Sequence, residues 1–134
     1  MTVLRWLAVA MIAVSALSIP PAWAASGSWV AEAPGLRVAV PERETRSPPL
    51  AAPDVIPGGA RISTLRWRFE ASTRRPLQAW LCHPARCIPL SSPSGRSTAL
   101  AELPATAPLH FRFRLPRGGQ AVQVEGVQVI VDYY

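Results

Sequence analysis

Few side chains in this sequence are of types that do covalent or metal chemistry. Cys82, His83 and Cys87 lie close together, and His110 is the only other histidine. A zinc site or a Cys–His nucleophile pair uses these atom types. However, the sequence has neither the usual zinc-ligand spacing nor the two-residue gap of redox cysteine pairs. We therefore expect no catalytic residue, no metal site and no cofactor.

The acidic residues also suggest no reaction. The chain has eight of them, scattered along its length, and no two are spaced as a recognisable catalytic couple. Gly58-Gly59 and Gly118-Gly119 are turn signals, because neither pair opens a helix as a phosphate-binding loop does. The sequence therefore predicts a protein that is not an enzyme. A small hydrolase whose carboxylate pair is assembled only by the fold remains the enzymatic alternative.

Paired arginines are the one pattern with the chemistry of a binding site. Arg66 and Arg68 share a face of one predicted strand, and Arg112 and Arg114 share a face of another. If those strands were neighbours, four guanidinium groups would line one surface able to grip carboxylates or phosphates bidentately. We take these four arginines as a tentative partner surface. The alternative is an ordinary solvated face.

The charge balance leaves both interpretations of the arginines open. The formal net charge is +6, which suits an acidic partner or an anionic lipid. All 14 basic residues are arginine, however, and together with the 15 prolines this is typical of a GC-rich genome. Nucleic acid is not expected, because no basic cluster lies on a predicted helix.

The first 24 residues have the pattern of a cleavable secretory signal peptide. A single arginine precedes an apolar run from Trp6 to Ile19, and Pro20-Pro21 ends this run short of the roughly 20 residues of a membrane span. Ala22-Trp23-Ala24 places small residues where a signal peptidase needs them, which predicts cleavage before Ala25. We therefore expect a periplasmic protein whose residues 25–134 form one domain without a membrane span.

An even cysteine count in an exported domain predicts a disulfide, here between Cys82 and Cys87. Pro76–Cys82 and Cys87–Ser91 are predicted to be the arms of a hairpin with a four-residue turn at His83–Arg86. Facing residues at the ends of two strands are close enough for the bond. Closing so short a loop is expected to stabilise the fold by about 2 kcal/mol.

Period-two alternation and turn signals predict the remaining strands. In chain order they are Trp29–Val40, interrupted at Pro34-Gly35, then Arg61–Glu70, Ser97–Leu103, Leu109–Leu115, Ala121–Val124 and Val127–Tyr133. A short helix is the alternative for Ser97–Leu103. A long Pro-rich connection at about 41–59 is predicted to be irregular, and such loops are functional or mobile. The pattern predicts an all-β fold, a small antiparallel β-sandwich that is immunoglobulin-like or related and carries one disulfide.

Over nearly all of residues 25–134 the chain resembles the FlhE family of flagellar proteins. The most specific similarities are the two cysteines with four residues between them and the C-terminal Gln-Val-Ile-Val-x-Tyr. Two segments depart from the family pattern, the Pro-rich stretch and the ending Asp132-Tyr133-Tyr134. The matching segments are Gly27-Ser28-Trp29, Ile62–Phe69, Leu81-Cys82, Cys87–Leu90, Pro108–Phe111, Pro116–Gly119 and Gln128–Tyr133.

The resemblance implies a periplasmic β-sandwich that is not an enzyme and is linked to flagellar assembly and swarming. Its partners would be the flagellar export apparatus, which it guards against proton leakage, or secreted axial (rod or ring) proteins, for which it acts as a chaperone. Such a protein works by covering a partner's exposed strand edge or apolar patch. The alternative is an exported β-sandwich that binds an acidic cell-envelope ligand, such as anionic lipid or peptidoglycan.

Overall fold

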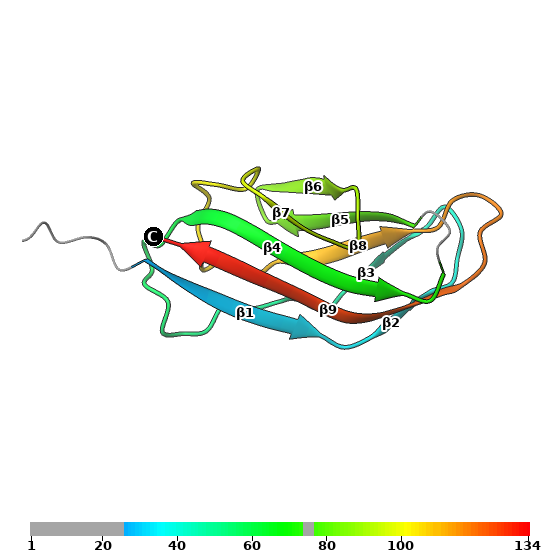
Figure 1. Cartoon of the computed structure of the whole chain (residues 1–134), viewed down its shortest axis with the longest axis horizontal. Coiled ribbons are helices and arrows are strands. Elements are labelled where there is room, and N and C mark those ends of the chain that lie inside the picture. Colours follow the sequence, from blue (N-terminus) through cyan, green and yellow to red (C-terminus); the bar gives the residue numbers. More distant parts are fainter. Residues whose placement is uncertain (1–25, 74–76) are drawn as a thin grey trace, which may run out of the picture.

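The computed structural model describes residues 26–73 and 77–134, which form two β-sheets packed face to face (Figure 1). The predicted signal peptide at residues 1–24 and its cleavage site before Ala25 lie outside this range. No helix within the described part is long and apolar enough to cross a membrane. The nine described strands are β1 (Gly27–Ala33), β2 (Leu36–Val38), β3 (Glu44–Arg46), β4 (Ile62–Ala71), β5 (Gln78–His83), β6 (Arg86–Leu90), β7 (Ser94–Ser97), β8 (His110–Arg114) and β9 (Val122–Tyr133).

The two sheets have different memberships. The five-stranded sheet has the order β1-β9-β4-β7, and β2 pairs with β9 beyond the end of β1. The four-stranded sheet has the order β3-β8-β5-β6. All of these strand pairs are antiparallel, including the pair of β1 with β9, which joins the start of the described chain to its end. The prediction of an all-β antiparallel sandwich with one disulfide is confirmed.

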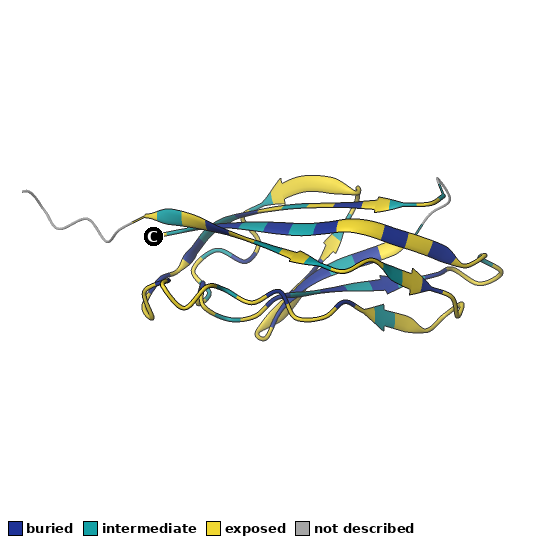
Figure 2. Ribbon diagram, turned by 90° about the horizontal axis from the view of Figure 1, so that it is seen from below, coloured by how far each residue is buried: buried dark blue, intermediate teal, exposed yellow. Residues whose placement is uncertain are grey.

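Three phenylalanine rings hold the two sheets together. Phe69 comes from β4, and Phe111 and Phe113 come from β8 in the opposite sheet. The Phe69 ring centroid lies 5.1 Å from that of Phe113 and 6.2 Å from that of Phe111, both edge-on. Buried and exposed residues alternate along the long strands (Figure 2), as the period-two pattern predicts. Residues between the buried positions, the arginines among them, therefore point outward.

The last strand is longer than predicted. Ala121–Val124 and Val127–Tyr133 are expected as two strands, but β9 is continuous through Glu125-Gly126. Gly126 has a φ of 62°, and the register to β4 shifts at this point. Between its pairings to Arg68 and Glu70, β9 carries one residue more than β4. The glycine therefore marks a bulge that bends the strand, where the sequence suggests a turn that ends it.

The Pro-rich connection is not wholly irregular, so that prediction was wrong in part. It contains β3, which pairs with β8, and an isolated bridge between Leu50 and Leu109. The backbone N–H of Ser47 donates to the carbonyl of Phe111 at 2.9 Å, and the N–H of Phe111 donates to Oγ of Ser47 at 2.9 Å. Leu50 is buried. The connection therefore follows the edge of β8, although its sequence has no strand pattern.

The strand predicted at Ser97–Leu103 is also misplaced. The structure has β7 at Ser94–Ser97, and turns follow it. A short polar strand is possible here because β7 is an edge strand that pairs only with β4 in the described sheet. Gly95 lies opposite Trp67, and a Cβ atom at Gly95 would come within 2.8 Å of the Trp67 ring. Glycine is needed at this position because the indole lies across the strand.

The hairpin turn is shorter than predicted. His83 and Arg86 face each other as the last pair of β5 and β6, which leaves a two-residue turn at Pro84-Ala85. The backbone N–H of Ala85 donates to Nδ1 of His83 at 3.0 Å, so Nε2 carries the proton and donates to the carbonyl of Pro104 at 3.0 Å. The buried imidazole therefore ties the turn to the loop before β8.

Replacing His83 with alanine is expected to lower the free energy of unfolding by about 2 kcal/mol, because two hydrogen bonds of about 1 kcal/mol each are lost. Urea unfolding of the wild type and of His83→Ala measures this difference. The exposed Val55→Ala, on the Pro-rich connection, is the control and should change stability little. Equal stability of His83→Ala and the wild type would show that the imidazole does not fix the turn.

Candidate functional site

The arginines predicted to form one surface lie on two. Arg66 and Arg68 belong to β4 of the five-stranded sheet, whereas Arg112 and Arg114 belong to β8 of the four-stranded sheet. Each pair points away from the core on the outer face of its own sheet. The condition for a four-arginine surface, that the strands be neighbours, is not met. The two faces therefore have to be considered separately.

On the four-stranded sheet, Arg112 is engaged within the protein. Its Nε donates to Oε2 of Glu44 at 3.0 Å, and its Nη2 pairs with the other carboxylate oxygen. The guanidinium carbon lies 5.7 Å from the centre of the Trp80 ring, and Nη1 lies 3.4 Å from Sγ of Cys87. Arg112 thus connects β3, β5 and β6 to β8. It acts as a structural link rather than as a free ligand for a partner.

Beside this link lies the disulfide, whose prediction is confirmed. Cys82 and Cys87 face each other across β5 and β6, with a Cα–Cα distance of 4.0 Å and an S–S distance of 2.06 Å. Cys82 is fully buried, while Cys87 is exposed. No group of three or more His, Cys, Asp or Glu side chains in the described ranges is arranged to hold a metal ion.

His110 lies opposite Cys82 on the same outer face, next to the row in which Arg46 faces Arg112. Burial lowers the pKa of His110, Arg46 and Arg112 lower it further, and Glu44 partly opposes them. The Nε2 atom is buried and has no hydrogen-bond partner among the described residues. The folded protein therefore resists protonation of this imidazole.

The free energy of unfolding is expected to fall as the pH is lowered below about 6.5, the usual pKa of histidine. In this range the unfolded chain binds a proton at His110 that the folded chain binds less readily, so acid favours unfolding. Urea unfolding on both sides of this pH measures the slope, and His110→Gln should make it shallower. An unchanged slope in His110→Gln would contradict the account.

The outer face of the five-stranded sheet carries a different arrangement. One row across its strands consists of Val30, Ile130, Arg66 and Arg96, each opposite the next. In the next row, Arg68 of β4 lies between Gln128 of β9 and Ser94 of β7. We call Arg66, Arg68 and Arg96, with the apolar Val30 and Ile130 beside them, the arginine face. The three arginines and Ile130 line a hollow of about 390 Å³.

Arg66 is the one arginine of this face with a carboxylate partner. Its Nη2 donates to Oδ1 of Asp132 at 3.0 Å, and the hydroxyl of Ser28 donates to the same oxygen. Burial alone raises the pKa of Asp132, but the hydrogen bonds from Ser28 and Arg66 outweigh it and hold the pKa below its usual value. Asp132 is therefore ionised at neutral pH. No ion pair to Arg68 or Arg96 occurs within the described residues, which include every Asp and Glu of the sequence.

Sequence reasoning missed two residues that matter here. Arg96 was not predicted because Ser94-Gly95-Arg96-Ser97 has the composition of a turn. Only the pairing of this segment with β4 places Arg96 on the arginine face. Glu44 was not predicted because it lies in the Pro-rich connection, where no strand is expected. The alternating charges of Glu44-Thr45-Arg46 were the available signal.

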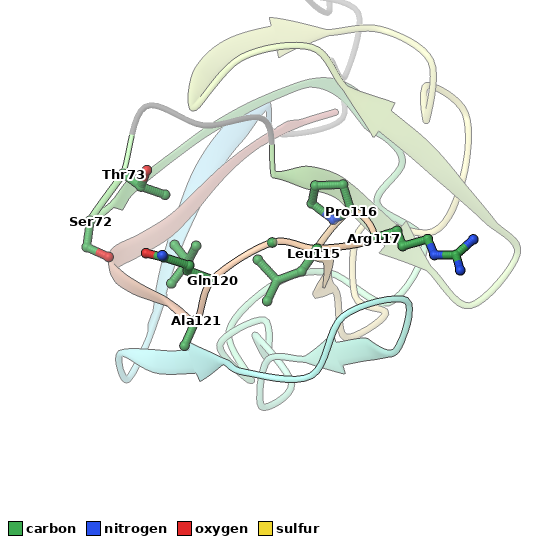
Figure 3. A pocket seen from close by; sticks show the side chains of 10 residues that line it. Ser72, Thr73, Leu115, Pro116, Arg117, Gln120 and Ala121 are labelled. Atoms are coloured by element: carbon green, nitrogen blue, oxygen red, sulfur yellow. The ribbon is translucent and has the colours of Figure 1, made fainter.

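A second hollow, also of about 390 Å³, lies behind the turn between β8 and β9 (Figure 3). Gln120 points toward Ser72 across it, whereas Arg117 points away. Its lining contains no carboxylate, histidine or cysteine. The hollow therefore has no set of groups for acid–base or nucleophilic chemistry.

The chain matches a known protein family. The family model described as Flagellar protein FlhE matches residues 35–134. A Flagellar protein FlhE from Yersinia enterocolitica is 38% identical over 119 residues, covering 81% of this chain and 82% of the relative. The Flagellar protein FlhE of Salmonella typhimurium is 29% identical over 132 residues, covering 96% of this chain and 98% of the relative.

A solved structure is similar as well. The structure titled Crystal Structure of FLHE superposes with a TM-score of 0.74 at 32% sequence identity. The match covers 82% of this chain and 98% of the solved chain. The similarity therefore extends over the whole sandwich fold of that relative.

Proposed function

We propose that this chain, which belongs to the FlhE family of flagellar proteins, acts in the periplasm as a chaperone-like accessory of flagellum assembly. The observation that carries the proposal is the family match over residues 35–134. The periplasmic location is supported by the disulfide, since such bonds persist in oxidising compartments. It is also supported by the signal-peptide pattern of residues 1–24.

The proposed mechanism is binding rather than catalysis. An accessory of this kind covers a strand edge or an apolar patch that an unassembled subunit leaves exposed. β1 forms one edge of the five-stranded sheet (Figure 1), and it offers seven residues without proline. By contrast, the edge strand β6 contains Pro89, the fourth of its five residues, which has no backbone N–H to donate to a partner strand. We therefore propose β1 as the edge that pairs with a partner strand.

Deletion of the gene from its native host tests this function. We expect reduced swarming and the protein in the periplasmic fraction of the wild type. A photo-crosslinking residue placed at Val30, which is 50% exposed on β1, should capture an export-apparatus, rod or ring protein. Normal swarming together with no flagellar crosslink would contradict the proposal. The envelope-ligand function would then take its place, because Arg68 and Arg96 suit an acidic ligand.

A further inference from the structure

We infer that the arginine face binds an acidic, partly apolar peptide segment of a partner protein. A carboxylate of this segment accepts hydrogen bonds from Arg68 and Arg96, while an aliphatic side chain covers Val30 and Ile130. The identification of that partner as a flagellar protein rests on the proposed function, but the chemistry of the surface does not.

The first argument is the placement of like charges. Arg66 and Arg96 lie directly opposite each other on β4 and β7, and like charges in this position destabilise a sheet. Asp132 forms its ion pair with Arg66 and acts on Arg96 only by Coulomb attraction, without a direct contact. A bound carboxylate would relieve the repulsion and supply the missing acceptors for Arg68 and Arg96.

The second argument is the order of side chains across the sheet. The row runs from two apolar residues, Val30 and Ile130, to two cations, Arg66 and Arg96. Four neighbouring strands span about 14 Å. About four residues of extended chain cover this distance. A short segment with an aliphatic residue at one end and acids at the other therefore matches the row.

A peptide fits this face better than a membrane surface does. Glu32 lies on the same face of the sheet and accepts a hydrogen bond from Gln128 at 3.2 Å. Asp132, which pairs with Arg66, also lies on this face. These two carboxylates lie on β1 and β9, beside the arginines of β4 and β7, and would repel a broad anionic surface that covers the whole sheet. A single narrow segment can place its carboxylates over β4 and β7 alone, where a guanidinium binds a carboxylate bidentately.

The test is a titration of the purified protein with the peptide acetyl-Ile-Val-Ser-Glu-Glu-amide. We expect binding that weakens as salt is added and that shifts the Nε–H resonances of Arg68 and Arg96. Arg96→Glu should weaken the affinity about tenfold or more, because one charged hydrogen-bonding group is lost and a repulsive one is gained. The same peptide with glutamine in place of both glutamates should bind as weakly.

The matched control is Arg117→Glu, which changes the net charge equally at the exposed turn between β8 and β9. It should leave the affinity unchanged. Arg96→Glu should melt no earlier than the wild type, because it replaces a like-charge pair with an opposite-charge pair facing Arg66. A lower melting temperature, or equal weakening by Arg117→Glu, would overturn the inference.

Vesicles containing phosphatidylglycerol and isolated peptidoglycan test the other acidic ligands. Retention on either one through Arg68 and Arg96, with no peptide binding, would overturn the inference in favour of an envelope ligand. The titration contains no flagellar component. Its failure would therefore leave the proposed function standing, whereas normal swarming of the deletion strain together with no flagellar crosslink would refute that function and leave peptide binding intact.

Discussion

Replacing Phe113 with alanine is expected to lower the free energy of unfolding by about 3–5 kcal/mol. The ring is completely buried, stacks at 5.9 Å on Phe111 and meets Phe69 of the opposite sheet edge-on at 5.1 Å. Its removal leaves a cavity at the contact between the two sheets. Denaturant unfolding followed by tryptophan fluorescence measures the loss.

Arg114→Ala provides the matched comparison, since Arg114 is the next residue of β8 and points to the opposite side of the sheet. We expect this variant to change the free energy of unfolding by less than about 0.5 kcal/mol. Similar losses in both variants would contradict the assignment of inner and outer faces. The same alternation of buried and exposed positions along β4 places Arg66 and Arg68 outside the core.

Removing the disulfide is expected to cost about 2 kcal/mol of unfolding free energy, because the bond closes only a short loop. The double substitution Cys82→Ser and Cys87→Ser makes the change, and unfolding in urea measures it. This is a large share of the stability of a small domain, so the variant should also melt earlier.

Treatment of the wild type with a reducing agent is the control for this double variant. The reduced wild type should lose about the same stability, and the double variant should not respond to the reagent. A reduced wild type as stable as the oxidised protein would show that the hairpin is held without the bond. The two-residue turn and His83 would then account for its geometry.

The sequence predicts the fold class well because buried and exposed residues alternate along most of its long strands. Leu65 and Phe69 of β4 point into the core, and so do Phe111 and Phe113 of β8, as period-two alternation requires. The paired cysteines likewise predict the hairpin of β5 and β6, although the turn is shorter than expected. Local pattern is sufficient in these places because each strand has one buried face.

The site is harder to predict because it depends on which strands become neighbours. Arg66 and Arg112 look alike in sequence, yet β4 and β8 belong to different sheets. The alternation of apolar and polar residues shows which side of the sheet a residue faces, but it does not show which strand lies next to its own. Arg96 lies on an edge strand with no buried alternation of its own, so only the register with β4 reveals it.

Complementation of swarming tests the central claim, that a flagellar accessory works through the arginine face, most directly. The deletion strain of the native host receives the wild-type gene, the double variant Arg68→Glu with Arg96→Glu, or the control Arg117→Glu, at equal periplasmic levels. We predict that the wild type and the control restore swarming and that the double variant does not. Full restoration by the double variant would contradict the claim.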